Sequence, residues 1–231
     1  MRLYMILPGL EPALVRRPSV CPRCGCQAEQ MKHHQRVVKP VQDTGNNHVP
    51  TSRYRCPQCG HTFRAYPQGV GRAALSQRLK NVAVLLHLLG LSYQSVEAAL
   101  EALGLYVSKT RICAAVQEAR ETAPSLERHA VFSRIQVPQP AKALRPVKSP
   151  ARGTRPPRLA EPIACGPGDG IRVRCEERWL TLRLAAADAT GLVLLVDDMP
   201  AGLAEGLKDW CRSLQGTLDV RLLFDGDGGA L

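Results

Sequence analysis

The chain has 231 residues, of which 31 are Lys or Arg and 20 are Asp or Glu, so its formal net charge is +11. This length suffices for two or three small domains. No apolar run approaches the roughly 18–20 residues that cross a bilayer, and the first ten residues lack the length and cleavage site of a signal peptide. We therefore expect a cytoplasmic protein with no membrane partner.

The positive charge is unevenly distributed along the chain. Residues 163–231 hold 7 basic and 11 acidic side chains, a net charge of −4, so the first 162 residues carry +15. A basic segment of this kind attracts phosphate polyanions or anionic membrane surfaces, with an affinity that falls as salt rises. The acidic tail is expected to have a different role.

Two Cys-Pro-x-Cys-Gly segments, at residues 21–25 and 56–60, are the most specific feature of the sequence. Each places two thiolates on a tight turn, and its glycine can adopt the positive φ that directs backbone N–H groups toward sulfur. In a reducing compartment such pairs favour metal over disulfides. Because four thiolates suit a tetrahedral ion, we predict a structural Zn2+ held by Cys21, Cys24, Cys56 and Cys59. Reduced or redox-active thiols are the alternative.

The 31 residues between Cys24 and Cys56 predict a long β-hairpin between the two turns, and hence a zinc ribbon over residues 20–70. Metal binding would supply most of the folding free energy of so small a ribbon. Spare ligand candidates beside the complete set of four are Cys26, His33, His34, His48 and His61. The basic residues expected to contact phosphate are Arg53, Arg55 and Arg64, with Arg23, Lys32, Arg36 and Lys39. A solvated basic face is the alternative.

After Gly71 the apolar residues follow a helical period, with a stripe formed by Leu75, Leu79, Val82, Leu86 and Leu89. Serines at 92 and 108 are expected to cap two further helices, and glycines at 90 and 104 to end the first two. Three short helices over residues 71–130 predict a helix-turn-helix. Its third helix would enter the major groove with Lys109, Thr110 and Arg111 at the bases. An ordinary three-helix bundle is the alternative, and His87 is expected to be a packed core histidine.

Residues 131–162 are predicted to be a basic linker, because positions 131–160 hold seven Arg or Lys, six prolines and no acid. It either follows a DNA backbone or is a simple tether. The tail from residue 163 predicts a three-stranded meander (170–174, 179–186, 192–196), a helix (201–214) and a fourth strand (220–224). This is the element order in the N-terminal half of a ribonuclease H-like domain.

In ribonuclease H-like folds, acids on the first and fourth strands meet at the centre of the sheet and hold two divalent metals. Asp169 precedes the first predicted strand and Asp225 follows the fourth, so we predict that these two carboxylates meet. The other acids of the tail are assigned to turns: Asp188, Asp197, Asp198 and Asp227.

The chain resembles insertion-sequence transposases that have an N-terminal zinc ribbon, a helix-turn-helix and a DDE catalytic domain. The resemblance rests on residues 54–64 and 88–93, and on the tail segments 169–170, 188–191 and 224–226. It implies that Asp169 and Asp225 are the first two carboxylates of a catalytic triad that uses Mg2+ or Mn2+ to cut and join DNA. It also implies double-stranded DNA at the element ends as partner, and allows a homo-oligomer.

The sequence departs from that family at the third carboxylate, which lies on a helix well beyond the fourth strand in such enzymes. Here no Glu follows Glu205, and the sequence ends at Leu231. We therefore expect an α+β multidomain protein with an N-terminal extension (1–19), ribbon, helix-turn-helix, linker and partial ribonuclease H-like domain (163–231). Its expected function is that of a truncated transposase, inactive alone. The alternative is a non-catalytic DNA-binding regulator or transposase remnant.

Overall fold

A computed structural model of the protein describes residues 2–7, 9–11, 15–27, 31–44, 46–124, 126, 128, 131–136, 170–186, 192–200, 202, 203, 207, 210, 214, 218 and 221–224. For residues 31–37, 185, 186, 192 and 221–224 we describe the backbone alone. No described helix is long and apolar enough to span a membrane.

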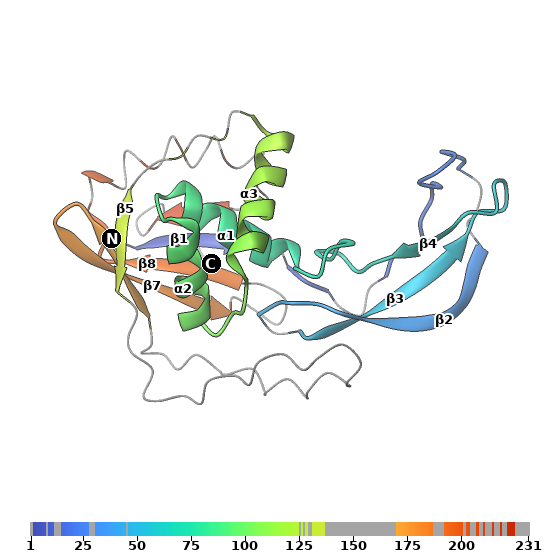
Figure 1. Ribbon diagram of the computed structural model, residues 1–231, viewed down its shortest axis with the longest axis horizontal. Helices are drawn as coiled ribbons and strands as arrows, with labels where there is room; N and C mark the ends of the chain where they lie inside the picture. The colour runs from blue at the N-terminus through green and yellow to red at the C-terminus, as the bar shows by residue number, and fades with distance from the viewer. Residues whose placement is uncertain are drawn as a thin grey trace.

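The described elements form a mixed α+β fold with two antiparallel sheets (Figure 1). The larger sheet has six strands in the order β5-β6-β7-β8-β1-β9, and the smaller has three in the order β2-β3-β4. The strands are β1 (Leu3–Leu7), β2 (Met31–Pro40), β3 (His48–Arg55), β4 (Thr62–Ala65), β5 (Phe132–Gln136), β6 (Ile171–Cys175), β7 (Arg178–Ala186), β8 (Leu192–Asp197) and β9 (Arg221–Phe224). The helices are α1 (Gln77–Leu88), α2 (Tyr93–Ala102) and α3 (Lys109–Thr122).

The N-terminal residues, expected to be an extension, form strand β1 inside the six-stranded sheet. Leu3, Met5 and Leu7 are buried, while Tyr4 and Ile6 between them are partly exposed, as the two faces of a strand require. The strand pairs with β8 on one side and with β9 on the other. Five residues alternating in this way have no stability alone, so the pairing depends on segments about 190 and 220 positions further along.

The predicted ribonuclease H-like arrangement of the tail is wrong. β6 and β9, which were expected to bring two acids together, are separated by β7, β8 and β1. Four strand spacings correspond to about 19 Å. Every intervening pair of strands is antiparallel, so β6 and β9 run parallel to each other. The first residue of β6 and the last residue of β9 therefore lie at opposite ends of their strands. Asp169 and Asp225 themselves lie outside the described residues.

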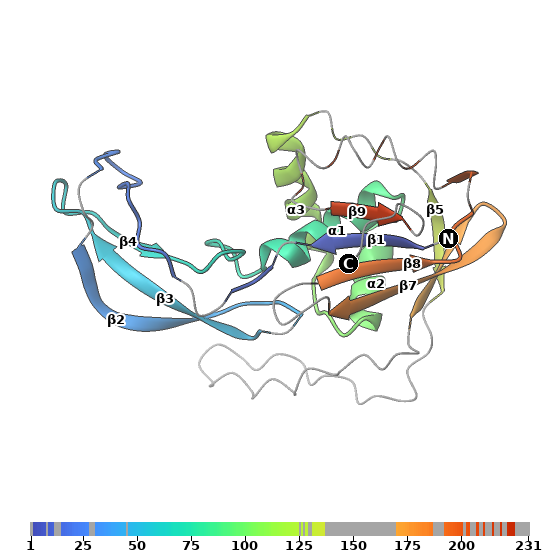
Figure 2. The ribbon, with the colours of Figure 1, turned by 180° about the vertical axis from the view of Figure 1, so that it is seen from behind.

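The three helices pack on one face of the six-stranded sheet, as Figures 1 and 2 show from opposite sides. A single hydrophobic cluster joins Leu3 and Met5 of β1, Leu86 of α1, Ile112 of α3 and Leu182 of β7. The predicted boundary between a helical domain and a tail domain therefore does not exist as a break in the core. Each strand has one apolar face and each helix one apolar stripe, and in this fold the apolar face of the sheet packs against the apolar stripes of the helices.

The three predicted helices are confirmed, and Ser92 and Ser108 occupy the predicted N-cap positions of α2 and α3. The side chains of Ser76 and Ser92 accept hydrogen bonds from backbone N–H groups three residues on, whereas Ser108 makes no such bond. Gly90 and Gly104 follow α1 and α2 with φ of 120° and 78°. The positive φ explains glycine at these two positions.

His87 is a packed core histidine, as predicted. Its side chain is buried, Nδ1 lies 2.9 Å from the carbonyl oxygen of Leu91, and its ring stacks on Tyr93 at 4.3 Å between centroids. Burial, followed by the charges of Arg128 and Arg120, lowers the pKa of His87, against the raising effect of the Leu91 carbonyl.

The start of the predicted linker is a strand, not an irregular segment. β5 pairs with β6, and Phe132 is fully buried beneath the helices, with its N–H donating to the carbonyl of Leu89 at 2.6 Å. The apolar residues at 131, 132 and 135 pack in or against the core and anchor this edge strand to it. The remainder of the predicted linker, residues 137–162, lies outside the described residues, as do Asp188 and Asp227.

The three-stranded sheet extends as an arm from the rest of the protein (Figures 1 and 2). β2 and β3 are the long hairpin expected between the two cysteine segments. At the base of the arm, the side chain of Asp43 is completely buried. Its Oδ1 accepts hydrogen bonds from Nε of Arg78, at 2.7 Å, and from the hydroxyl of Ser76, at 2.6 Å. The hydroxyl of Ser76 also caps α1, so this buried ion pair fixes the arm to the first helix.

Candidate metal centre and basic surfaces

Both cysteine segments form the same turn. Backbone N–H groups of Gly25 and Gly60 donate to the carbonyls of Cys21 and Cys56, at 2.9 and 3.0 Å. The two glycines have φ of 70° and 68°, as predicted, which a residue with a Cβ rarely adopts. The first cysteine of each turn, Cys21 or Cys56, is buried, and the second, Cys24 or Cys59, is exposed.

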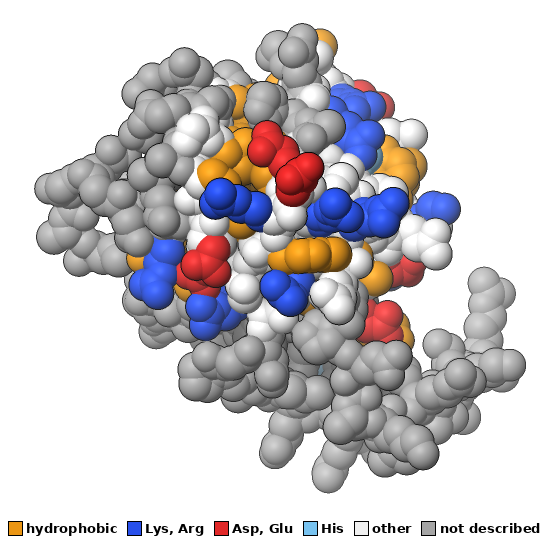
Figure 3. Space-filling model, turned by 90° about the vertical axis from the view of Figure 1, so that its left-hand side faces the viewer, with side chains coloured by type: hydrophobic (Ala, Val, Ile, Leu, Met, Phe, Trp, Pro, Cys, Tyr) orange, Lys and Arg blue, Asp and Glu red, His pale blue; other side chains and the backbone are white. Residues whose placement is uncertain are grey.

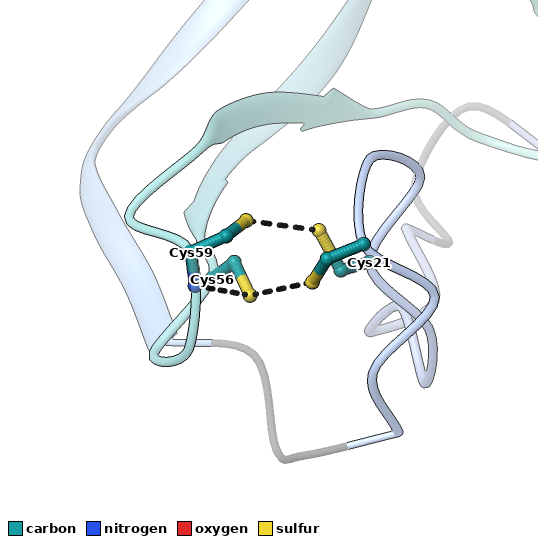
Figure 4. Close-up of side chains that lie close together, drawn as sticks. Cys21, Cys56 and Cys59 are labelled. Atoms are coloured by element: carbon teal, nitrogen blue, oxygen red, sulfur yellow. Dashed lines mark hydrogen bonds between the residues drawn. The ribbon is translucent and has the colours of Figure 1, made fainter.

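The four predicted sulfur atoms come together between the two turns and could hold a metal ion. All of their ligand atoms lie within 4.8 Å of one another. Sγ of Cys21 is 3.7 Å from Sγ of Cys59, and Sγ of Cys24 is 3.7 Å from Sγ of Cys56. Figure 4 shows Cys21 facing Cys56 and Cys59 across the gap between the turns.

These separations fit a metal centre better than disulfides. A disulfide requires sulfur atoms about 2.05 Å apart, whereas an ion bound by four thiolates at about 2.3 Å has sulfur atoms about 3.8 Å apart at the corners of a tetrahedron. The observed 3.7 Å separations match the second geometry. The donor set of four thiols therefore fits a metal such as zinc.

Backbone N–H groups favour the thiolate form of the first cysteine in each turn. The N–H of Cys59, 3.5 Å from Sγ of Cys56, is the main cause that lowers the pKa of Cys56 to about 6. The N–H of Cys24 likewise lowers the pKa of Cys21. Backbone N–H groups also act to lower the pKa of Cys24 and of Cys59. Desolvation and the neighbouring thiols outweigh them, so the pKa of each of these two cysteines is raised overall. Thiolates are the form that binds a metal.

The spare ligand candidates differ in how close they lie to this centre. Sγ of Cys26 is 3.3 Å from Sγ of Cys56, so a fifth sulfur lies beside the group of four. His61 stacks on Phe63 at 6.3 Å, and its carbonyl accepts from the N–H of Cys56. His48 pairs with Pro40 at the other end of the hairpin, far from the cysteines. The side chains of His33 and His34 are outside the description.

A basic strip lies on the outer face of β3 and β4, directly beside the cysteine turns. Arg53 and Arg64 are opposite each other in the strand register, and Arg55 is two residues further along the same face. All three are exposed. Like charges placed directly opposite each other are unfavourable in a sheet, and no ion pair to a described acid relieves them. This strip is suited to bind an anion.

Lys39 does not belong to this strip, contrary to the sequence-based expectation. Its ammonium group donates to the carbonyls of Gly71 and Ala73 and lies over the ring of Tyr66, 4.8 Å from the centroid. Burial, with the nearby charges of Arg64 and Lys80, lowers its pKa. Lys39 therefore holds the base of the arm against the following loop. Arg23 is exposed, and the side chains of Lys32 and Arg36 are outside the description.

The N-terminus of α3 exposes the three predicted contact residues, Lys109, Thr110 and Arg111. The guanidinium of Arg111 donates to the side-chain oxygen of Gln42, at the base of the arm, so this helix end adjoins the arm. A carboxylate also lies here, because Glu97 of α2 accepts a hydrogen bond from the N–H of Lys109 at 3.1 Å. Glu97 thus occupies part of the anion-binding end of the helix dipole.

Sequence reasoning missed three of the residues that shape this region: Gln42, Asp43 and Glu97. Each contacts a residue that is 12 to 69 positions away in the sequence, and a local sequence pattern does not reveal such a contact. The one available signal was Asp43 itself, one of two acids among residues 20–71, since an isolated acid in a basic segment has arginines as ready partners.

No protein-family model, no curated protein and no solved structure matches this chain.

Proposed function

We propose that this protein binds duplex DNA through the basic strip and the N-terminus of α3, and that a structural zinc ion fixes the strip. The observation that carries the proposal is the exposed, unrelieved pair of Arg53 and Arg64 across strands β3 and β4. Guanidinium groups bind phosphate through paired N–H donors. The DNA backbone carries one negative charge per about 1.7 Å of helix axis, which matches closely spaced cations of this kind.

Zinc is proposed as a structural ion because the four thiols complete a tetrahedron. A catalytic zinc keeps one position for water or substrate, whereas a structural one is closed by four protein ligands. Cys56 lies at the end of β3, immediately next to Arg55, and β4 begins two residues after Gly60. An ion bound here would therefore hold the register of the two strands that carry the strip.

α3 supplies the element that enters a groove. It has 14 residues, which corresponds to about 21 Å of helix, and the B-form major groove is about 12 Å wide and admits one helix. Because Arg111 contacts Gln42 at the base of the arm, the helix end and the arm can contact neighbouring parts of one duplex. Phosphate contacts by the strip would set orientation, and the side chains of α3 would read bases.

The proposal includes no DNA cleavage or strand transfer. The strand order separates β6 from β9, so the two predicted acids gain no support as a metal-binding pair. The relation to insertion-sequence transposases stays a prediction. The alternative expectation, a non-catalytic DNA-binding protein, is the one that the exposed basic residues favour.

The strip is tested by fluorescence anisotropy with a labelled duplex. Arg53→Gln combined with Arg64→Gln should weaken binding by roughly ten-fold to a hundred-fold at 0.1 M salt, because two phosphate contacts are lost. Arg120→Gln makes the same kind of charge change at the exposed C-terminal turn of α3 and should change affinity less than about two-fold. Equal losses in the two proteins would mean that net charge, not the strip, attracts DNA.

The metal is tested by elemental analysis of protein purified under reducing conditions. We expect one zinc per chain, lost in Cys24→Ser and in Cys59→Ser, with the core around α1 still folded. Cys113→Ser, in α3, is the matched control and should retain the metal. Cys26→Ser should also retain it, because the tetrahedron is complete without the fifth sulfur. Wild-type protein without zinc would disprove the metal assignment.

A further inference from the structure

The face of the six-stranded sheet opposite the helices carries a second basic surface, at the end formed by β5, β6 and β7. Strand register assigns Arg134, Arg172 and Arg174 to this face, because their neighbours Ile135 and Val173 pack in the core cluster on the helix side. Arg134 and Arg172 are exposed and Arg174 is half-buried. Figure 2 shows this face with no described element in front of it.

The charge on this face is predominantly positive. Strand register assigns four arginines of β5 to β7 to this face, Arg134, Arg172, Arg174 and Arg183, and Asp197 is the single acid of β5 to β8 among the described residues. Two exposed acids, Glu176 and Glu177, lie in the hairpin between β6 and β7. Asp197 is buried and already neutralised by Arg2 and Arg183, whose Nε atoms donate to its two oxygens at 2.8 and 2.9 Å. Arg134 and Arg172 form no ion pair with a described acid, and Nε of Arg174 donates to the carbonyl of Glu176 at 3.1 Å.

An aromatic side chain lies among these arginines. Trp179 of β7 is paired with Arg174 across the sheet and is partly exposed. The guanidinium of Arg172 lies 5.8 Å from the centroid of the indole. Figure 3, which looks at this end of the molecule, shows Lys and Arg side chains around exposed apolar ones, with Asp and Glu side chains between them. An indole bordered by guanidinium groups offers both stacking and phosphate contacts.

Gly170, which immediately precedes β6, lies close against the neighbouring strand β7. A Cβ atom placed on Gly170 would lie 2.6 Å from a methyl of Thr181 and 2.7 Å from the Cγ of Arg183, both in the neighbouring strand β7. A side chain is therefore excluded at this position, and β6 lies close against β7 where the arginines emerge.

We propose that Arg134, Arg172, Arg174 and Trp179 form a binding surface for single-stranded DNA. Stacking on a tryptophan requires an exposed base face, which a paired duplex hides along its length and a single strand presents at every nucleotide. The arginines on β5 and β6 are about 5 Å apart across strands and about 7 Å apart along one strand, so they can follow a phosphate backbone. The choice of DNA over RNA rests on the proposed function.

This surface is separate from the basic strip. β5 lies at the end of the six-stranded sheet that is distant from the arm, as Figure 1 shows. The two surfaces can therefore be inactivated independently, and failure of one assignment does not imply failure of the other.

The test measures two affinities of the full chain by anisotropy, one for a labelled oligothymidine of about 12 nucleotides and one for a duplex. Trp179→Leu should weaken single-strand binding about ten-fold to a hundred-fold, with Arg172→Gln having a similar effect, and both should leave duplex affinity within two-fold. Trp179→Phe should retain most of the single-strand affinity, because an aromatic ring remains. Arg178→Gln, in the same strand but next to the hairpin, should change neither.

The reciprocal variant separates this proposal from duplex binding. Arg53→Gln with Arg64→Gln should weaken duplex binding and spare the oligothymidine. If Trp179→Leu, folded as judged by circular dichroism, bound the oligothymidine as the wild type does, the surface would be wrongly assigned. Tighter binding of oligouridine than of oligothymidine would overturn the choice of DNA, whatever the duplex result.

Discussion

Nε of Arg2 donates a hydrogen bond to Oδ1 of Asp197 at 2.8 Å, although 195 positions separate the two residues. The contact joins the start of β1 to the end of β8. Because Arg183 of β7 binds the other carboxylate oxygen at 2.9 Å, one buried acid connects three adjacent strands. The N-terminal strand is thus held in the sheet by side chains as well as by its backbone.

We predict that Asp197→Asn lowers the free energy of unfolding. The change removes the negative charge that accepts three hydrogen bonds, one from Arg2 and two from Arg183, and a hydrogen bond to a charged group contributes about 1.5–3 kcal/mol. The loss should lie toward the lower end, because the Arg2 side chain is 57 % exposed and its interaction is screened. Urea denaturation measures the change. Asp198→Asn is the control: this neighbour is exposed with φ of 63°, a conformation that asparagine tolerates. Equal effects would contradict a specific role for Asp197.

Glu97→Gln should raise the affinity for duplex DNA. Its carboxylate accepts from the N–H of Lys109 at the end of α3 that is proposed to approach the groove. Replacing it with a neutral side chain removes repulsion of phosphate and leaves the helix dipole less compensated. We expect a several-fold tighter complex at 0.05 M salt, with less effect at 0.3 M, because salt screens the interaction. The comparison is Glu121→Gln, an exposed acid in the last turn of α3. A larger gain in affinity for Glu121→Gln would indicate that DNA approaches the C-terminal end of α3, and would contradict the proposed contact at its N-terminus.

The stability of the core should fall on mild acidification because of His87. Burial, the largest cause, lowers its pKa below the ordinary value, so the unfolded chain binds the proton more readily than the folded one. The stabilisation is therefore complete above about pH 6.5 and is lost as pH falls below that value. His87→Gln, which cannot titrate but can donate to the Leu91 carbonyl, should reduce the difference in unfolding free energy between pH 7.5 and pH 5.5.

Asp43→Ala should destabilise the protein by about 3–5 kcal/mol, because it leaves Arg78 buried without its counter-charge. The double change Asp43→Ala with Arg78→Met should recover much of this loss, since an apolar pair replaces a buried ion pair. Thermal unfolding of the three variants and the wild type gives the coupling between the residues. If the double variant were as unstable as the sum of its single changes, the two residues would not act as a pair.

The sequence predicted the local features of the fold well. Matched glycines after each cysteine pair indicated two identical turns, and the serine caps located α2 and α3. These signals depend on backbone conformations of four to six residues, which a sequence specifies directly. The strand positions in the tail were predicted for the same reason, from alternation and turn residues.

The sheet order could not be predicted, because it depends on pairing between distant segments. β1 has only five residues, and nothing in that segment indicates that β8 and β9 will lie on either side of it. Asp197 was assigned to a turn, yet it ends β8 and is buried. A buried acid is stable only with its two arginines, and one of these is the second residue of the chain.

The salt dependence of duplex binding tests the central claim most directly. Five basic side chains are proposed to contact phosphate or base edges: Arg53, Arg55, Arg64, Lys109 and Arg111. If most of them neutralise a phosphate, log affinity of the zinc-loaded chain should fall with log salt concentration with a slope of about −3 to −5, at about −0.9 per contact. A titration of a labelled duplex between 0.05 and 0.3 M salt measures this slope. A slope near zero, or no binding at 0.05 M salt, would contradict duplex binding by the basic strip and the N-terminus of α3.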